Sequence, residues 1–314
     1  MNDIVLQEIK NYSNSHNIKK VIAGVSGGSD SICMLSLIKK AGLEVTALHC
    51  NFNLRGEESV RDRNFVDKIC KSANIPLEII EFDVKQYLVA NKGVSLEMAC
   101  RKLRHDWFAE KKIEFLADRI VLGHNADDNI ETFFLNLLRG SGTSGLKGME
   151  YDNGVIWRPL LNFHKETILG YLERNNLSYV TDSTNLLSDY RRNFLRNEVI
   201  PLLKKEWKGF NKCLDKTIKN LESENKIVKN SLDHILNTYK DKLPLEEIKA
   251  FPAPELLVRT FLSPLKPFST TASEVLDAIR AEKPHSPKWN LPGGSAFFKK
   301  GSLHRVIKIE EEGH

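Results

Sequence analysis

The chain has 314 residues, a length that corresponds to about two domains of usual size. Hydrophobic residues make up 41% and charged residues 28%, a balance that excludes a wholly disordered chain. The net charge of only +5 permits a polyanionic partner without indicating one. The sequence shows neither an apolar run long enough to span a bilayer nor a signal-peptide core, so we expect a cytoplasmic protein with no membrane partner.

The first half of the chain alternates short apolar runs with longer segments of helical spacing. We interpret four runs as buried strands: 20–25, 45–49, 77–82 and 119–123. This alternation predicts an α/β domain in which helices cover both faces of a parallel sheet. Ligands bind beyond the carboxyl ends of such strands, so the residues from Ser26, His49 and His124 onward are candidates for a site.

The character of the sequence changes near residue 190. Nine Lys or Arg residues face four Asp or Glu residues between positions 188 and 219. Helical spacing continues to about Tyr239, and short strands are expected near the end. We therefore expect a catalytic domain over 1–210 and a smaller, mainly helical domain with a short terminal β element over 211–314.

The five cysteines form no Cys-x-x-Cys pair, which argues against a zinc, redox or iron–sulfur clip. Most of them lie in apolar stretches, and we interpret these as small buried hydrophobic residues in a reducing compartment. The five are Cys33, Cys50, Cys70, Cys100 and Cys213.

Residues 24–31 form a glycine-rich loop, Gly-Val-Ser-Gly-Gly-Ser-Asp-Ser, between a predicted strand and a predicted helix. Two adjacent glycines let several backbone N–H groups point at one anion, and the helix that follows adds its positive end. The spacing matches neither the Walker A motif nor the dinucleotide-binding turn. The alternative interpretation is a Ser-Gly turn that only caps the helix.

A second polar motif, residues 123–132, follows another predicted strand and reads Gly-His-Asn-Ala-Asp-Asp-Asn-Ile-Glu-Thr. If a helix begins near Asp127, then Asp127, Asp128 and Glu131 occupy its first turns. Such carboxylates suit Mg²⁺, but an acid-rich helix start also complements the helix dipole by itself. The stretch after this helix, 139–146, is rich in Gly and Ser and by itself indicates a flexible loop.

These motifs carry a family resemblance. Residues 26–31 resemble the Ser-Gly-Gly-x-Asp-Ser signature of the PP-loop, or N-type, ATP pyrophosphatases, which have an adenine nucleotide alpha hydrolase-like fold. The order of motifs in 123–132 and 139–146 is similar to that of the tRNA(Ile)-lysidine synthetases within this superfamily. Further agreeing stretches are 49–59, 97–105, 158–161, 182–185 and 192–196. Phe52 and Asn53 stand where many relatives carry His-Gly, so we assign neither a catalytic role.

The resemblance implies a reaction. ATP adenylates the C2 oxygen of the wobble cytidine, position 34, in an isoleucine tRNA with a CAU anticodon. Free L-lysine then displaces AMP through its ε-amine, which leaves lysidine and changes codon recognition from AUG to AUA. It also implies a possible homodimer, and the chain resembles the shorter form of the family, which lacks the last C-terminal domain.

The resemblance also implies roles for particular residues. ATP binding falls to Ser26, Gly27, Gly28, Ser29, Asp30 and Ser31. Asp30, Asp127 and Asp128 are expected around Mg²⁺, and His124 and Arg101 are expected to stabilise charge; Arg104 either joins them or pairs with Glu97 or Asp106. Glu131, Asp128 and Asp182 are alternatives for the carboxylate that binds and deprotonates lysine. The tRNA-binding candidates are Arg139, Arg191, Arg192, Arg196 and the row Lys204–Lys219, which begins with Lys204 and Lys205. The alternative interpretation of this row is a solvated helix face without a partner.

Three other functions remain open from the sequence. A PP-loop tRNA thiolase would sulfurate a base, but such enzymes commonly use cysteine pairs that this chain lacks. A PP-loop amidotransferase acting on a small metabolite predicts no tRNA-binding tail. A non-catalytic nucleotide- or RNA-binding module would not need the acids Asp30, Asp127 and Asp128 beside phosphates.

Overall fold

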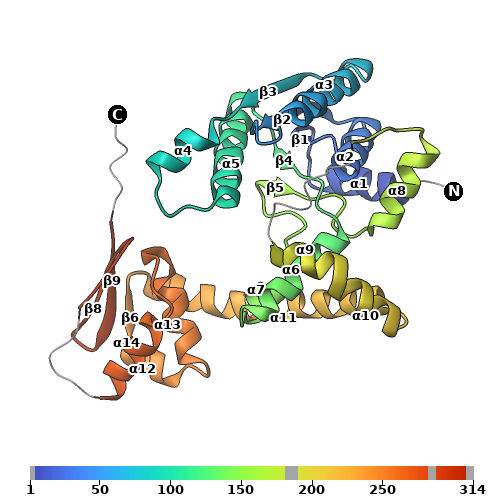
Figure 1. Ribbon diagram of the computed structural model, residues 1–314. Coiled ribbons are helices and arrows are strands. Elements are labelled where there is room, and N and C mark those ends of the chain that lie inside the picture. The colour runs from blue at the N-terminus through green and yellow to red at the C-terminus, as the bar shows by residue number, and fades with distance from the viewer. Residues whose placement is uncertain (1–3, 181–189, 282–287, 309–314) are drawn as a thin grey trace. The chain divides into compact units, whose positions relative to one another are not determined.

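The computed structural model describes residues 4–180, 190–281 and 288–308, and the chain divides into two compact units, Met1–Glu222 and Ser223–His314 (Figure 1). The division falls inside one long helix, α11 (Phe210–Tyr239), somewhat further along the chain than the boundary we predict at 210.

The first unit is built on a five-stranded sheet with the order β3-β2-β1-β4-β5. Every neighbouring pair of these strands is parallel, as the alternation of strands and helices predicts. The strands are β1 (Lys20–Gly24), β2 (Glu44–Asn51), β3 (Leu77–Glu81), β4 (Arg119–Val121) and β5 (Ile156–Trp157).

Helices connect and cover these strands. They are α1 (Ile4–Ser15), α2 (Ser29–Lys40), α3 (Glu57–Ser72), α4 (Val84–Ala90), α5 (Leu96–Glu114), α6 (Ala126–Leu138), α7 (Thr143–Leu146) and α8 (Lys165–Arg174). After them come α9 (Tyr190–Phe194), the π-helix η1 (Leu195–Val199) and α10 (Ile200–Glu206), which lead to α11.

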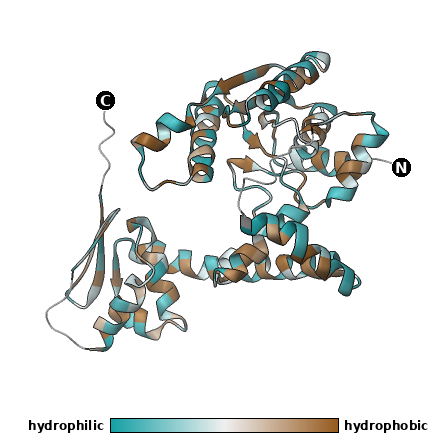
Figure 2. Cartoon of the chain, viewed as in Figure 1, coloured by the Kyte–Doolittle hydropathy of each residue, from teal (hydrophilic) through white to brown (hydrophobic). Residues whose placement is uncertain are grey.

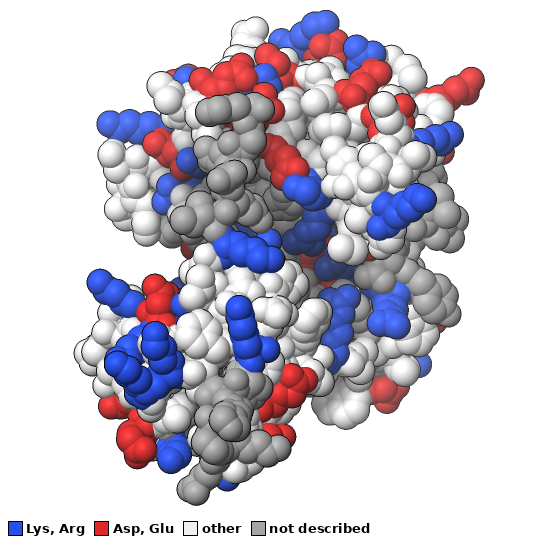
Figure 3. Space-filling view, turned by 90° about the vertical axis from the view of Figure 1, so that its left-hand side faces the viewer, with Lys and Arg blue, Asp and Glu red and all other residues white. Residues whose placement is uncertain are grey.

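The helices carry both polar and apolar residues, visible as teal and brown on the same helix in Figure 2. Within the described ranges, none of the helices is both long and apolar enough to cross a membrane. Figure 3 shows basic and acidic side chains interspersed over the face that it draws, in keeping with a near-balanced total charge.

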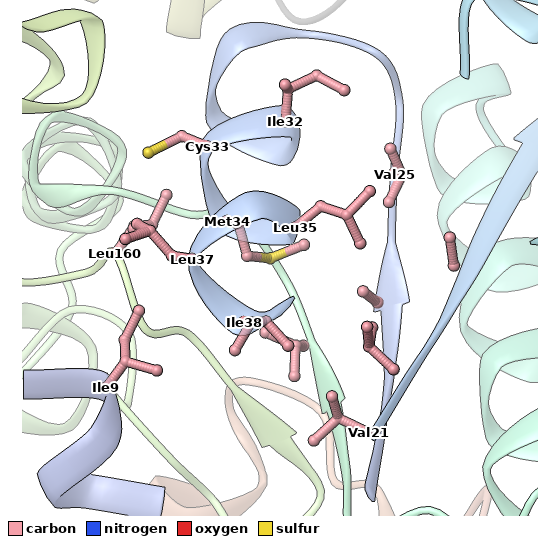
Figure 4. Close-up of a cluster of buried hydrophobic side chains, with 14 of the residues drawn as sticks. Ile9, Val21, Val25, Ile32, Cys33, Met34, Leu35, Leu37, Ile38 and Leu160 are labelled. Atoms are coloured by element: carbon pink, nitrogen blue, oxygen red, sulfur yellow. The ribbon is translucent and has the colours of Figure 1, made fainter. Parts of the chain in front are cut away.

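The sheet separates two hydrophobic clusters because successive residues of a strand point to opposite faces. On one face, Val21 and Ala23 of β1 pack with residues of α1, α2, α3 and α8. On the other face, Ile22 packs with Trp107 and Phe108 of α5. Figure 4 shows α2 lying along β1, so the loop that joins them is fixed at both ends by buried apolar side chains.

The second unit contains a four-stranded antiparallel sheet with the order β6-β9-β8-β7, packed with short helices. Its helical core comes from α13 (Pro254–Leu262) and α14 (Thr271–Arg280), in which Leu257, Phe261 and Val275 are fully buried. This confirms the mainly helical second domain with a terminal β element. The remaining elements are β6 (Lys242–Pro244), α12 (Leu245–Ala250), η2 (Ser263–Leu265), β7 (Lys288–Leu291), β8 (Gly294–Lys299) and β9 (Ser302–Ile307).

Two local predictions are corrected. The Gly/Ser stretch after α6 is not a plain flexible loop: it contains α7, and the Asn136 side chain donates to the carbonyl of Gly145 at 2.9 Å. The cysteines are also less uniform than predicted, because Cys33 and Cys70 are buried whereas Cys213 is exposed. Cys213 lies on α11.

Candidate active site

A cavity of about 700 Å³ lies in the first unit, where the residues that follow β1, β2 and β4 meet. Its lining includes Ser26 after β1, His49 and Phe52 at the end of β2, and His124 after β4. The residues that we expect to form a site beyond the carboxyl ends of these strands therefore line one cavity.

The cavity wall carries a marked excess of basic side chains. Six arginines line it: Arg55, Arg101, Arg104, Arg139, Arg158 and Arg192. The acidic residues of the lining are Asp30, Asp62 and Asp128, and Asp62 is paired with Arg55 at 3.0 Å. A cavity with this balance attracts an anion of several charges, such as a polyphosphate.

The glycine-rich loop enters the cavity between β1 and α2. The Gly27 N–H donates to Ser31 Oγ at 3.2 Å, and Ser31 Oγ donates to the carbonyl of Gly28 at 2.8 Å, which holds the loop closed. Ser29, Asp30 and Ser31 are the first residues of α2, where the N–H groups of a helix have no intrahelical acceptor. The loop thus presents backbone donors and the positive end of the helix dipole, as predicted.

The two glycines of the loop are required for different reasons. Gly27 has a φ of +95°, a conformation that side chains disfavour. Gly28 has extended backbone, and a Cβ added there would meet only Ser26 Oγ, at 3.5 Å, which is ordinary contact. The fold alone thus tolerates a side chain at position 28, and a glycine there leaves the backbone open to close approach by an anion.

The acids at the start of α6 are directed to different partners. Asp128 lines the cavity and forms a capping box with Asn125, each side chain accepting from the other residue's N–H at 3.0 Å. Asp127 does not belong to the cavity lining: its carboxylate accepts from Lys204 Nζ at 2.8 Å and from the Lys165 N–H at 2.8 Å. Burial opposes ionisation of Asp127, but His164, Lys204 and Lys165 outweigh it and lower its pKa.

The predicted set of three metal-binding carboxylates is therefore not assembled. Asp30 and Asp128 share the cavity, whereas Asp127 is held outside it. Among the residues that the structure describes, no three His, Cys, Asp or Glu side chains are grouped to hold a metal ion. Two carboxylates beside a polyphosphate pocket nevertheless fit Mg²⁺, which commonly binds one or two carboxylates together with substrate phosphates.

His124 is a neutral imidazole surrounded by arginines. Burial, followed by the charges of Arg158, Arg104, Arg192 and Arg101, lowers its pKa to about 3. Arg158 Nε, which can only donate, contacts His124 Nδ1 at 3.3 Å. Because Nδ1 accepts from Arg158, the ring hydrogen lies on Nε2. His124 can therefore donate a hydrogen bond from Nε2 to an anion bound in the cavity.

Glu131 lies beneath the cavity as a buried carboxylate whose side chain is 3% exposed. Arg196 binds both of its oxygens, with Nε–Oε1 at 2.6 Å and Nη2–Oε2 at 2.9 Å, and Arg192 Nε lies 3.5 Å away. Burial raises the pKa of Glu131, and Arg196 opposes this effect. The buried carboxylate of Glu131 is thus paired with a partly exposed guanidinium, Arg196, and neither group lines the cavity.

The remaining predicted residues fall at several places. Arg101, Arg104, Arg139 and Arg192 line the cavity, and Asp106 pairs with Lys102 rather than with Arg104. Gly27, Gly28, Ser29, Arg191, Lys204 and Lys205 are absent from the lining, and Lys204 is engaged by Asp127. Asp182, with the rest of 182–185, lies outside the described residues.

Some site residues escaped prediction from the sequence. Arg158 and Arg55 line the cavity, and both lie in stretches that carry the family resemblance, which is the signal that would have found them. Lys165 and His164 at the start of α8 also escaped. Lys165 contacts the glycine-rich loop, and His164 contacts Asp127 and Asp215. Nothing in their local sequence indicates these contacts, because the partners are more than 35 residues away.

The chain is similar to known proteins over most of its length. Residues 1–203 match the PP-loop domain family. The chain is 36% identical over 291 residues to a tRNA(Ile)-lysidine synthase from Porphyromonas gingivalis, covering 92% of this chain and 61% of that relative. A tRNA(Ile)-lysidine synthase from Bacteroides thetaiotaomicron is 36% identical over 267 residues, with 84% of this chain and 62% of the relative covered. The chain thus spans about three fifths of the length of these curated relatives.

A solved structure shows the same fold at low sequence identity. The U34-tRNA thiolase NcsA from Methanococcus maripaludis, with its [4Fe-4S] cluster, has a TM-score of 0.57 and 20% identity. The match covers 69% of this chain and 78% of the thiolase. This likeness concerns the fold, whereas the family match over residues 1–203 shows that the chain belongs to the PP-loop family.

Proposed function

We propose that the chain is an ATP-dependent tRNA(Ile)-lysidine synthase. In this reaction the C2 oxygen of cytidine 34 attacks the α-phosphorus of ATP, and the bond to pyrophosphate breaks. The ε-amine of lysine then attacks C2, AMP leaves with that oxygen, and the amine loses a proton. The observation that carries the proposal is the arginine-lined cavity, in which Ser26, Asp30 and Ser31 of the PP-loop lie with the neutral His124 and the acid Asp128.

The PP-loop is suited to bind the phosphate tail. The N–H groups of Ser29, Asp30 and Ser31 lie at the start of α2, and the hydroxyls of Ser26 and Ser31 line the loop. These donors are in place before ATP arrives, so little reorganisation is needed when negative charge moves onto the leaving pyrophosphate. Asp30 would hold Mg²⁺ together with the substrate phosphates, and the bound ion neutralises phosphate charge.

The arginines are suited to the α-phosphate and the cytidine oxygen. Arg101, Arg104 and Arg158 surround His124, and their charges favour its neutral form until an anion is bound. A bound phosphate offsets these charges, and the Nε2–H of His124 then donates to oxygen that becomes negative as cytidine attacks. Oxygen on a pyrimidine carbon is a poor leaving group, so the adenylation has to precede the attack by lysine.

Asp128 is the acid best placed to receive lysine. It lines the cavity, whereas Glu131 is absent from the lining and its side chain is only 3% exposed. A carboxylate that holds the lysine ammonium near the adenylated base can also accept its proton before the attack. We therefore assign lysine binding to Asp128, with Arg196 Nη2 at 3.2 Å from Asp128 Oδ1 fixing its orientation.

The tRNA partner follows from the relatives and from the exposed basic residues. Arg139 lines the cavity and is exposed, and Lys205 on α10 is also exposed, so both are available to phosphates. A single base splayed out of a loop fits a cavity of this size while phosphates are held outside it. Arg191, Arg192 and Lys204 rank below these two as candidates for phosphate contacts. Arg192 and Lys204 already have carboxylate partners.

The thiolase alternative has less support. Its likeness in structure is at 20% identity and concerns the fold. Cys50 is the cysteine that lines the cavity, and burial raises the pKa of its thiol to about 12, which disfavours the thiolate needed for sulfur transfer.

The test is direct. Protein is incubated with ATP, Mg²⁺, radiolabelled lysine and isoleucine tRNA with a CAU anticodon, and methionine tRNA with the same anticodon is the control. We expect lysine incorporation with AMP and pyrophosphate only for the isoleucine tRNA. Asp30→Ala should abolish pyrophosphate release and leave the circular dichroism spectrum unchanged. Pyrophosphate release without lysine incorporation would contradict the proposed function.

A further inference from the structure

We propose that Lys165 is a ligand for the pyrophosphate part of ATP and that Asp127 is the residue that positions it. Lys165 lies outside the glycine-rich loop, 135 residues from Asp30 in the sequence. The inference rests on the proposed use of ATP and adds a cation to the phosphate site.

The ammonium group of Lys165 lies against the PP-loop. Nζ is 2.7 Å from Ser29 Oγ, 2.8 Å from Asp30 Oδ1 and 2.7 Å from Asp30 Oδ2. Ser29 and Asp30 are the first two residues of α2, where the backbone donors for phosphate also lie. Lys165 thus places a positive charge in contact with the glycine-rich loop. Its side chain is 39% exposed, so it retains room to move.

The charges of this site require such a cation. Asp30 carries a carboxylate that lines the cavity, and it would repel a phosphate bound at the adjacent start of α2. An ammonium on a flexible four-carbon stem can exchange one carboxylate oxygen for a phosphate oxygen without leaving the loop. Since Ser29 and Asp30 hold Nζ within hydrogen-bond distance of α2, only a small movement is needed to contact the phosphate tail.

The backbone of Lys165 is fixed independently of its side chain. Lys165 is the first residue of α8, and its N–H donates to Asp127 Oδ2 at 2.8 Å. The same carboxylate accepts from Lys204 Nζ at 2.8 Å and contacts His164 Nδ1 at 3.3 Å. Asp127 therefore caps the start of α8, and this role explains why an acid of the second motif is absent from the cavity lining.

Helix α8 is also anchored to α2 further along. Tyr171 on α8 is fully buried, and its hydroxyl lies 2.9 Å from Ser36 Oγ on α2. The contacts of Lys165 with the start of α2 and of Tyr171 with Ser36 join the two helices at two separate points. The start of α8 is therefore fixed beside the PP-loop. Asp127 thereby acts on phosphate binding through Lys165 and not by contact with the nucleotide.

The test measures binding of ATP, inorganic pyrophosphate and AMP to the full chain by calorimetry. Lys165→Met should weaken binding of ATP and pyrophosphate by about ten- to a hundredfold, the loss typical of a charge-assisted hydrogen bond. AMP binding should change by less than about twofold, and Lys165→Arg should retain most of the affinity. Lys39→Met, at the far end of α2, is the control and should bind all three ligands as the unchanged protein does. Equal losses for AMP and pyrophosphate, or no loss, would overturn the proposal.

Two double variants separate the possible causes. If Lys165 only offsets the charge of Asp30, then adding Lys165→Met to Asp30→Asn causes no further loss of pyrophosphate binding, which would overturn the ligand role; a further loss in the Asp30→Asn background supports it. Asp127→Asn should weaken pyrophosphate binding less than Lys165→Met does, with no further loss when the two are combined. Additive losses would remove the positioning role of Asp127. Failure of lysine incorporation with intact, Lys165-dependent pyrophosphate binding would refute the proposed function and leave this inference standing.

Discussion

The pairing of the buried Glu131 carboxylate with the partly exposed Arg196 makes a quantitative prediction about stability. Arg196→Met leaves the Glu131 carboxylate, 3% exposed, with Arg192 at 3.5 Å as its remaining ion-pair partner in the described structure. Removing one partner of a buried ion pair costs about 3–5 kcal/mol. For a unit of this size the corresponding fall in Tm is roughly 6–20 °C, at about 2–4 °C for each kcal/mol.

The cost should depend on pH with a definite sign. Burial already raises the pKa of Glu131, and loss of Arg196 would raise it further. Protonation removes the unpaired buried charge, so the loss of stability should be largest at pH 8 and should shrink as the pH falls toward the raised pKa.

The measurement is urea denaturation followed by tryptophan fluorescence, since Trp107, Trp157 and Trp207 all lie in the first unit. The control is Arg63→Met, which breaks the exposed Arg63–Glu81 pair, 3.6 Å apart, and should cost about 1 kcal/mol or less. Glu131→Gln combined with Arg196→Met should recover part of the loss. An Arg196→Met variant no less stable than Arg63→Met would refute the reasoning.

Three further predictions concern the loop, the start of α8 and the basic residues. Gly28→Ala should keep the Tm within about 2 °C but weaken ATP binding, whereas Gly27→Ala should lower the Tm because its φ is +95°; equal Tm values for the two variants would contradict this. His164, whose pKa its partners Asp127 and Asp215 raise to about 9, stabilises the fold fully below its ordinary pKa of 6.5 and loses this effect as the pH rises through 9. His164→Gln should therefore be less stable than the unchanged protein at pH 6, by a difference in Tm that disappears by pH 10. In salt titrations of tRNA binding, Lys205→Met should lower the slope by about 1 and Lys204→Met should leave it nearly unchanged, since Asp127 already holds Lys204; the opposite order would exclude the assignment.

The sheet and the position of the site were predictable because each depends on local sequence. An apolar run such as the one around Val21 and Ile22 is expected to be buried in a parallel sheet, and in the structure this run forms the buried strand β1. The place of the cavity then follows from the common direction of the strands, which brings Ser26, His49 and His124 to one edge.

The partners of the acids were not predictable in the same way. Asp127 and Asp128 are adjacent in sequence, but successive residues of a helix point about 100° apart, so they serve different neighbours. The partners of Asp127 include Lys204, 77 residues away, which no local pattern reports. Asp128 has a local partner in Asn125, and the spacing of a capping box, three residues, was present in the sequence.

The uneven exposure of the cysteines has a practical consequence for measuring these events. Burial raises the thiol pKa of Cys50, Cys70 and Cys100, and Cys33 is buried, so alkylating reagents should react slowly with all four. Cys213 is exposed on α11, next to Lys212 in the basic row. A maleimide dye should therefore label the unmodified chain at one position, where its fluorescence would report the arrival of RNA without any engineered cysteine.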